Sequence, residues 1–248
     1  MTVPTRPPAS FVPRPSPQTR EQSYDLRHPE ARGGLPPRRS WRAPCAPPRV
    51  APWDPWNAPE GADPERARQQ LRDGTWIRLR SLRRDDRAAL LEWFDGLSAQ
   101  SRRLRFFGPK PALAPYEIDR LLDVDGNRQH AILATEGVRG TGRVAGIVRF
   151  VRDAKDPRHA EIAIGVVDDF QSRGLGLVLL DRILTAAQCR GIELVIGEAL
   201  YENRRVGRLV RRVAPDARRR SLGITQQHVI DLARRVELGL LEPAGSGD

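Results

Sequence analysis

The chain has 248 residues, 42 Lys+Arg against 31 Asp+Glu, and a formal net charge of +11. This length allows one domain with an extension, or two small domains. The charge suits an anionic partner such as nucleic acid, an acidic protein or a phosphorylated small molecule, but solvated arginines alone produce the same excess. Uncharged apolar runs such as Ile162 to Val167 are too short to cross a membrane, and prolines from Pro4 onward exclude a signal-peptide core. We therefore expect no membrane contact.

Cysteine and histidine usage argues against two further kinds of site. Cys45 and Cys189 are the only cysteines, too few for a disulfide framework or a zinc site. The four histidines are scattered without metal-ligand spacing. We expect no bound metal and a reducing compartment, the cytoplasm.

Proline divides the chain into two parts, because sixteen of the 22 prolines fall in residues 1–64. This segment has few aliphatic residues and cannot bury enough apolar surface to offset its ordering entropy. We predict a disordered Pro/Arg-rich tail over 1–74, in which Pro64 to Arg72 forms a short helical lead-in. A folded domain over 75–240 and a flexible C-terminus over 241–248 complete the predicted organisation.

From Thr75 onward, hydrophobic periodicity, helix caps and turn residues define the expected elements. In chain order they are a strand over Trp76 to Arg80, a helix after Asp85 or Asp86, a helix within Pro115 to Leu122, strands over His130 to Thr135, Arg143 to Arg152 and His159 to Val167, a helix over Gly174 to Cys189, a strand over Leu194 to Leu200, a helix over Arg204 to Val213, and one more strand or hairpin arm within Ser221 to Leu232.

The order of these elements, β-α-α-β-β-β-α-β-α-β, indicates how the strands pair. Consecutive strands favour antiparallel hairpins, and the strand-helix-strand unit near the end favours one parallel pair. We therefore predict an α/β protein with a mixed sheet and helices on both faces.

The turn that leads into the longest helix has a composition suited to binding phosphate. It has the sequence Gln171-Ser172-Arg173-Gly174-Leu175-Gly176. Gly174 and Gly176 lack a Cβ, so a ligand can approach the main chain, and the first N–H groups of a helix have no intrahelical partner. Arg173 adds a forked donor. The spacing matches neither a P-loop nor a dinucleotide fingerprint, and a Gly-x-Gly pair before a helix is also common in turns that bind nothing.

This turn resembles motif A of the GNAT superfamily of N-acetyltransferases, in which Gln or Arg, two residues, Gly, one residue, and Gly or Ala follow a strand. Gln171, Gly174 and Gly176 occupy these positions. The resemblance extends in element order over Thr75 to Leu232 and is most specific over Glu161 to Asn203. It implies the GNAT acyl-CoA N-acyltransferase fold and acetyl-CoA as co-substrate.

The resemblance also implies where acetyl-CoA binds. The pantetheine arm would extend the sheet along the β-strand backbone, and the pyrophosphate would lie on the N–H groups that open the helix. The implied cofactor-binding residues are Ile164, Gly165, Val166, Gln171, Ser172, Arg173, Gly174, Leu175, Gly176, Leu177 and Asn203. Asn203 stands where family members often have an Asn that touches the pantetheine or the acceptor, although an ordinary helix N-cap accounts for it equally well.

Three further segments look like the bacterial protein lysine acetyltransferases, namely Ser101 to Gly108, Arg149 to Asp153 and Ala160 to Ala163. The narrower resemblance implies that the acceptor is an amine, with a protein lysine favoured. It also implies that Glu161 is the general base, since a lysine ammonium must lose a proton before it attacks a thioester.

Strand alternation places Glu161 on one face with Ala163 and Gly165, whose small size leaves room beside the carboxylate. Burial beside an apolar cofactor should raise the pKa of Glu161. The alternative interpretation is a salt bridge between Glu161 and a neighbouring strand arginine such as Arg149.

The sequence does not identify a general acid and so leaves open whether the chain is catalytically active. Many family members have a Tyr seven residues after the Asn, as acid for the leaving thiolate, but here that position is Val210, and Tyr201 does not match it. Either solvent protonates the thiolate, or the enzyme is slow, or the chain is a degenerate module that senses acyl-CoA. A basic nucleic-acid-associated protein is a further alternative, based on the eight arginines of Arg204 to Arg220. This stretch has no aromatic residue, so phosphates of CoA or an acidic protein surface are favoured over nucleic acid.

Overall fold

The computed structural model describes residues 68–137 and 142–234, which fold as one compact unit. Most of the predicted tail, up to residue 67, and the predicted C-terminal segment 241–248 lie outside the described residues. The described part begins in a strand at Arg68, ahead of the predicted domain start at residue 75.

That first strand corrects one prediction. The expected helical lead-in over Pro64 to Arg72 is wrong where the structure describes it, because Arg68–Gln70 forms strand β1. This strand pairs antiparallel with the next one through Gln69 opposite Ile77. Pairing along a sheet edge decides the conformation of such a short segment, whose own propensity is weak.

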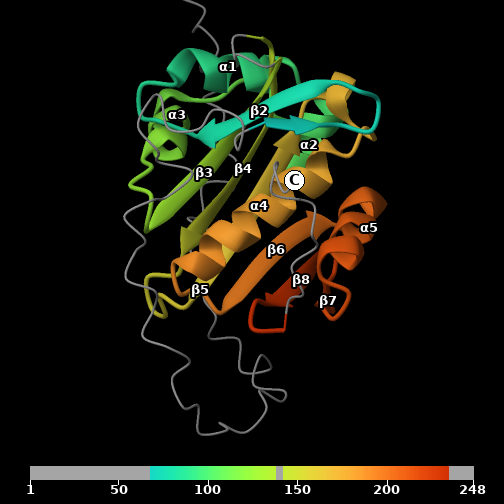
Figure 1. Cartoon of the computed structure of the whole chain (residues 1–248). Coiled ribbons are helices and arrows are strands. Elements are labelled where there is room, and N and C mark those ends of the chain that lie inside the picture. Colours follow the sequence, from blue (N-terminus) through green and yellow to red (C-terminus); the bar gives the residue numbers. More distant parts are fainter. Residues whose placement is uncertain (1–67, 138–141, 235–248) are drawn as a thin grey trace, which may run out of the picture. The chain divides into compact units, whose positions relative to one another are not determined.

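Eight strands of the described part of the chain form one sheet in the order β1-β2-β3-β4-β5-β6-β8-β7 (Figure 1). They are β1 (Arg68–Gln70), β2 (Trp76–Ser81), β3 (Gln129–Glu136), β4 (Val144–Arg152), β5 (His159–Val166), β6 (Leu194–Leu200), β7 (Arg218–Leu222) and β8 (Thr225–Asp231). All neighbouring pairs are antiparallel except β5 and β6, which are parallel. The predicted mixed sheet is confirmed, and so is the single parallel pair around the strand-helix-strand unit.

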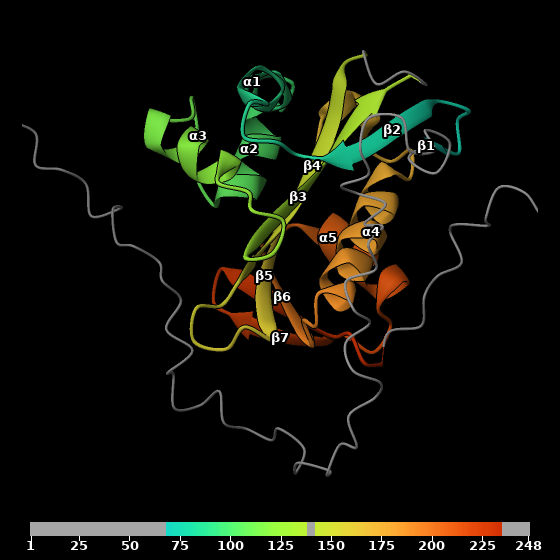
Figure 2. The same ribbon diagram turned by 60° about the vertical axis from the view of Figure 1, so that its left-hand side comes forward.

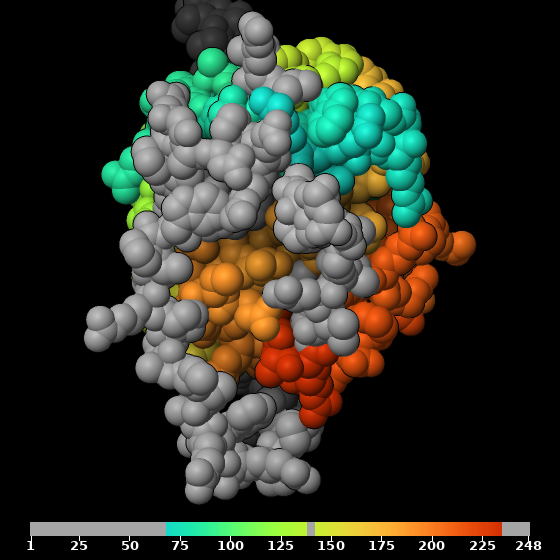
Figure 3. Space-filling view, in the orientation of Figure 1, coloured from blue at the N-terminus to red at the C-terminus, as the bar shows by residue number. Residues whose placement is uncertain are grey.

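Within the described residues, five α-helices cover the two faces of this sheet. They are α1 (Arg87–Asp95), α2 (Ala99–Phe106), α3 (Pro115–Leu122), α4 (Leu175–Cys189) and α5 (Arg204–Val213). Figure 2 shows α1, α2 and α3 on one side and α4 and α5 on the other. In the space-filling view, atoms of α4 lie between the cyan β1–β2 segment and the orange-red C-terminal segments (Figure 3).

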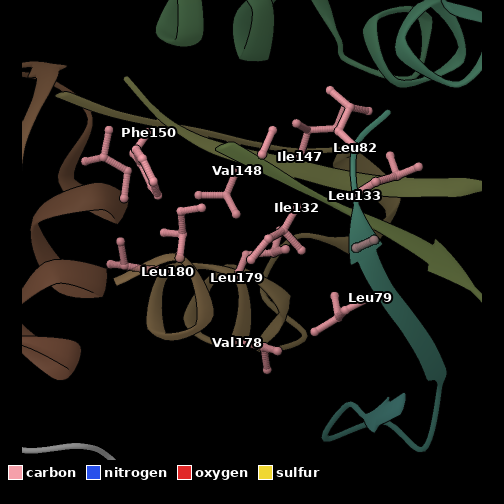
Figure 4. Close-up of a cluster of buried hydrophobic side chains, with 14 of the residues drawn as sticks. Leu79, Leu82, Ile132, Leu133, Ile147, Val148, Phe150, Val178, Leu179 and Leu180 are labelled. Carbon is pink, nitrogen blue, oxygen red and sulfur yellow. The ribbon is translucent and has the colours of Figure 1, made fainter. Parts of the chain in front are cut away.

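The core lies mainly between α4 and the middle strands. Leu179 and Leu180 of α4 point toward Val148 and Phe150 of β4 and toward Ile132 of β3 (Figure 4). All five side chains are almost completely buried. The predicted apolar stripe of this helix is therefore the face that packs on the sheet, and it fixes the start of α4 against the end of β5.

Two elements differ from the expectation. Helix α2 was not predicted, because its sequence is rich in arginine and none of its residues is fully buried. Ser98 caps it by accepting a hydrogen bond from the Ser101 backbone N–H at 3.2 Å, a local signal that the helical periodicity did not reveal. The C-terminal segment forms a complete hairpin, β7–β8, where the sequence indicated one strand or a hairpin arm.

The parallel pair β5–β6 is short. Its register runs from His159 opposite Leu194 to Ile162 opposite Gly197, and the strands separate after that point. The second half of β5 then pairs only with β4, while the second half of β6 pairs with β8. This separation opens the sheet in its middle.

Candidate active site

A cleft of about 1240 Å³ opens where β5 and β6 separate. Its walls come from the end of β5, the loop before α4, the second half of β6, and the helices α2 and α5. The cleft brings together most of the residues singled out in the sequence: Glu161, Ile164, Gly165, Val166, Gln171, Ser172, Gly174, Gly176, Leu177 and Asn203 line it. Arg173 and Leu175 do not line it.

The backbone of β5 presents two residues to the cleft. The Val167 N–H donates to the Ala145 carbonyl of β4 at 2.9 Å. Along a strand, the N–H and C=O groups of successive residues point alternately toward one neighbouring strand and the other. Gly165 therefore faces β4, whereas Ile164 and Val166 face the gap left by β6. The Val166 carbonyl accepts from the Gln171 side-chain amide at 3.0 Å, so the groups left open are those of Ile164 and the N–H of Val166.

Gly165 has a different role from the one expected. A Cβ at this position would lie 2.4 Å from Cζ2 of Trp93, which is 2 % exposed on α1. The indole Nε1 donates to the Gly165 carbonyl oxygen at 3.0 Å. The space beside Gly165 is thus filled by an aromatic ring, so it does not leave room beside Glu161.

Gln171 holds the loop after β5 in place through its side chain. Its Nε2 donates to the Ser101 hydroxyl of α2 at 3.0 Å and to Oδ1 of Asp168 at 2.9 Å, in addition to the Val166 carbonyl. Its Oε1 accepts from the Arg205 guanidinium of α5. One amide therefore ties together the end of β5, the loop and two helices on opposite faces of the sheet.

The loop backbone has the conformation that exposes N–H groups. Ser172 has φ 63° and Gly174 has φ 100°, both in the left-handed region. Gly174 is the N-cap of α4, so the first N–H groups of the helix point out of its start. A Cβ on Gly176 would lie 3.6 Å from Leu209 and 4.0 Å from Val166, both ordinary contacts. Packing within the chain does not require glycine at 176, which leaves space in the cleft there.

Of the two arginines beside this loop, the one predicted to bind the cofactor, Arg173, does not line the cleft, whereas Arg72 does. The Arg173 guanidinium lies 3.1 Å from Oδ2 of Asp73, away from the cleft. Arg72, in the turn between β1 and β2, lines the cleft instead, and its side chain lies 3.8 Å from the position of a Cβ on Gly174. No local sequence pattern points to Arg72, since its position depends on the pairing of β1 with β2.

Asn203 is the N-cap of α5. Its Oδ1 accepts from the Val206 N–H at 3.4 Å, so the capping role considered for it is present. The residue also lines the cleft, so its two possible roles are compatible.

Glu161 projects into the cleft from β5, on the face of the sheet that carries α1 to α3. It is exposed to the cleft and forms no hydrogen bond or ion pair with any residue of the described part of the chain. Loss of water contact between the cleft walls raises the pKa of this carboxyl. The positive charge of Arg105 opposes that rise, and the negative charge of Glu198 adds to it.

The salt bridge considered for Glu161 does not form. Arg149 is 8 % exposed and donates to Oε1 of Gln129, and burial lowers its pKa to about 10. Arg105 of α2 lies with its guanidinium carbon 5.1 Å from the ring centroid of Phe106, and burial lowers its pKa to about 10 as well. Both cations therefore act on Glu161 only through space.

Glu198 is a cleft residue that sequence reasoning missed. It lies on β6, two residues after Ile196, which is opposite Glu161 in the parallel register. Because side chains alternate, Glu198 and Glu161 share one face of the sheet on the two sides of the gap. Glu198 likewise forms no hydrogen bond or ion pair within the described residues. The only sequence signal was its place on a strand, which does not reveal the opposite strand.

No tyrosine occupies the position where family members carry the acid. Val210 of α5 lines the cleft and is 6 % exposed. Tyr201 is 59 % exposed and does not line the cleft.

Among residues 68–137 and 142–234, no group of three or more His, Cys, Asp or Glu side chains is placed to hold a metal ion. In the same part of the chain, no helix is both long and apolar enough to cross a membrane.

Comparison with known proteins agrees with this geometry. Residues 91–214 match the Acetyltransferase (GNAT) family. The chain is 30% identical over 123 residues to "Acetyltransferase PA5475" of Pseudomonas aeruginosa, covering 50% of this chain and 66% of that protein. It is 29% identical over 163 residues to "Acetyltransferase Pat" of Mycolicibacterium smegmatis, covering 64% of this chain and 47% of that protein. The chain thus matches less than two thirds of the length of these curated relatives.

A solved structure shows the same fold. The GNAT domain of S. lividans PAT superimposes with a TM-score of 0.61 at 27% identity, covering 66% of this chain and 96% of that domain. Sequence, fold and cleft therefore lead to one conclusion: the chain belongs to the GNAT acetyltransferase family.

Proposed function

We propose that this protein transfers an acetyl group from acetyl-CoA to an amine, with a protein lysine as acceptor and Glu161 as general base. The observation that carries the proposal is the position of Glu161. An unpaired carboxylate with a raised pKa faces the same cleft as the loop Gln171–Gly176 and the open backbone of β5. The resemblance of Ser101 to Gly108, Arg149 to Asp153 and Ala160 to Ala163 to the bacterial protein lysine acetyltransferases supports a protein lysine as the acceptor.

The loop before α4 fits the diphosphate of acetyl-CoA. The left-handed residues Ser172 and Gly174 turn backbone N–H groups toward the cleft, and the positive end of the helix dipole favours an anion there. Leu175 is fully buried, so it contributes only its N–H. Arg72 would add a forked donor in the place first assigned to Arg173.

The pantetheine arm would take the place of the missing neighbour of β5. The open groups of Ile164 and Val166 lie along that edge of the cleft, with Asn203 on the opposite side. Gly165 contributes its small size, which allows Trp93 to brace the strand from behind.

Glu161 supplies the proton acceptor. An ammonium must lose one proton before its nitrogen has a free electron pair, and a carboxylate with a raised pKa is matched to that transfer near neutral pH. The amine nitrogen then bonds to the thioester carbonyl carbon, the carbon–sulfur bond breaks, and the nitrogen gives a second proton to water as the amide forms. The sulfur leaves as a thiolate and takes a proton from water, because Val210 offers none.

Turnover of acetyl-CoA tests the proposal. Purified protein is incubated with labelled acetyl-CoA and a panel of proteins, peptides and small amines, and products are identified by mass spectrometry. We expect acetylated lysine in a protein or peptide, and a loss of at least a hundredfold in rate for Glu161→Gln, as removal of a general base gives. Equal rates for wild type and Glu161→Gln would remove Glu161 as base.

A second candidate function is an acyl-CoA sensor without catalysis. It is favoured because Val210, which has no proton to donate, stands where family members carry the acid. Tight acetyl-CoA binding together with no transfer to any amine of the panel would favour this candidate. If the protein binds DNA or RNA with an affinity that falls steeply as the salt concentration rises, the nucleic-acid alternative would be favoured instead.

A further inference from the structure

The outer part of the sheet has one face that no described helix covers. On β8, Gln226, His228 and Ile230 are buried on the face where His228 lies close to Gly207 of α5, whereas the alternate residues Thr225, Gln227, Val229 and Asp231 are only half-buried. The half-buried set shares its face with Glu198 and Glu161. Helix α2 packs on β5 and β6 on this face, and no described helix extends over β8 and β7.

A row of side chains crosses this open face from the cleft to the edge of the sheet. Glu198 of β6 is opposite Gln227 of β8, and Gln227 is opposite Arg220 of β7. The next row links Ile196, Val229 and Arg218 in the same way. Residues directly opposite each other share a face, and adjacent strands lie about 4.8 Å apart, so Arg220 lies about 10 Å from Glu198.

The two ends of the row carry opposite charges without partners. Arg218 and Arg220 are exposed on an edge strand, and neither forms an ion pair with a carboxylate of the described residues. Glu198 and Glu161 at the cleft end are also unpaired. A ligand that places a cation and an anion about 10 Å apart would satisfy both ends.

The tip of the β7–β8 hairpin adds exposed apolar surface beside the cleft. Leu222 is 40 % exposed and Ile224 is 78 % exposed, and the Ile224 carbonyl accepts from the Tyr201 N–H at 2.9 Å. Tyr201 is 59 % exposed and directly precedes Glu202, which lines the cleft. Large apolar side chains next to unpaired arginines are typical of protein-binding surfaces, and the carboxylates at the cleft end oppose a phosphate backbone.

From this arrangement we propose that the open face of β6, β8 and β7 binds the lysine-bearing segment of the acceptor protein, with an acidic residue of that segment on Arg218 and Arg220. This proposal rests on the proposed function. It specifies that the acceptor lysine lies in a segment that also carries an acidic residue. A segment in the extended polyproline II conformation has three residues per turn and advances about 3.1 Å per residue, so the side chain three positions from the lysine lies on the same side of the segment, about 9 Å away.

The strand itself offers a matched control. Arg219 lies between the two arginines with the same exposure, but it is opposite His228 and therefore on the other face of the sheet. The test compares Arg218→Glu/Arg220→Glu with Arg219→Glu, using a lysine peptide with Asp three positions away and the same peptide with Asn there. Binding is followed by fluorescence anisotropy and transfer by mass spectrometry.

We expect wild type and Arg219→Glu to prefer the Asp peptide about tenfold in Kd and in kcat/KM, and Arg218→Glu/Arg220→Glu to lose that preference. A peptide with Lys in place of the Asp should regain binding to the doubly reversed variant. Equal affinity of wild type for the Asp and Asn peptides, or equal losses in both variants, would overturn the proposal. If the proposed function is wrong, no peptide is acetylated by any variant. The anisotropy measurement still shows in that case whether the Asp peptide binds and whether Arg218 and Arg220 are needed.

Discussion

The indole Nε1 of Trp93 donates a hydrogen bond to the carbonyl oxygen of Gly165 at 3.0 Å, 72 residues farther along the chain. This contact joins α1 to the strand that forms one wall of the cleft. It explains why residue 165 is glycine, since a Cβ there would overlap the ring. The wall of the cleft is thus held from behind by an aromatic side chain that does not face the cleft itself.

Replacing this glycine tests the contact. Gly165→Ala places a methyl group 2.4 Å from Trp93 Cζ2, so the ring or the strand must move. We expect a loss of about 1–3 kcal/mol in the free energy of unfolding, measured by thermal or urea denaturation. Gly108→Ala is the control, because a Cβ there meets nothing within 4 Å. A Gly165→Ala protein as stable as this control would contradict the account.

The side-chain amide of Gln171 should be needed to hold the loop before α4 in place, and a carboxylate at this position should not substitute for it. Gln171→Glu removes the amide donors to Ser101 and Val166 and sets a negative charge against Asp168, 2.9 Å from the present nitrogen. We expect a loss of about 1–3 kcal/mol in unfolding free energy and weaker acetyl-CoA binding, measured by calorimetry.

The control for this change is Gln188→Glu. Gln188 also donates to a backbone carbonyl, that of Leu232 at 3.3 Å, but it lies at the other end of α4. An acetyl-CoA affinity that falls equally in both variants would argue against a local role of Gln171.

A negatively charged side chain at the start of α4 should abolish the stabilisation of the protein by CoA. Gly174→Glu strains a residue with φ 100° and brings a carboxylate to the proposed phosphate loop. We expect CoA to raise the melting temperature of wild type but not of this variant. Gly191→Glu is the matched control, since it strains a φ of 75° at the far end of the same helix and should keep the CoA-induced shift. An unchanged shift in Gly174→Glu would remove this loop from the binding site.

The pH dependence of turnover should report Glu161. Its pKa is raised by loss of water contact, so the acidic limb of the kcat/KM profile should lie above the ordinary range of a glutamate. Below that limb the carboxyl is protonated and cannot accept the proton. In Glu161→Gln the residual activity should show no such limb. Glu193→Gln, a change at an exposed residue just before β6, should keep it.

Stability should change with pH in the same window. A carboxyl whose pKa is higher in the folded than in the unfolded protein binds more protons in the native state, so the free energy of unfolding falls as pH rises through that window. Glu161→Gln should flatten this part of the stability curve, measured as urea midpoints against pH. The opposite slope difference would show that the arginines around Glu161 lower its pKa.

The elements around the motif could be predicted from the sequence because their signals are local. The bounds of β6 and α5 agree with the expected ranges, and α4 begins one residue after the expected Gly174. Helix α2 gave no such signal, since its arginines leave no apolar stripe. Local patterns thus identified the strands and helices that bury a face, and they failed where a helix buries none.

The composition of the cleft was less predictable, because it depends on contacts between distant segments. Glu198 meets Glu161 only through the register of β5 with β6, and Arg72 reaches the loop only through the pairing of β1 with β2. Arg173 was assigned to the cleft by its place in the motif, yet its partner is Asp73, 100 residues earlier. Sequence spacing cannot reveal such neighbours until the order of strands is known.

The separation of β5 from β6 gives this sheet a third edge, in its interior. Outer edges such as β7 can be shielded by charge, and arginines stand there, but the interior edge at Ile164 and Val166 has hydrogen-bonding groups with no strand to pair with. A ligand that lies along it completes the sheet as a non-peptide strand would. The amides of Ile164 and Val166 should therefore exchange with deuterium quickly in the free protein and slowly once the cleft is filled.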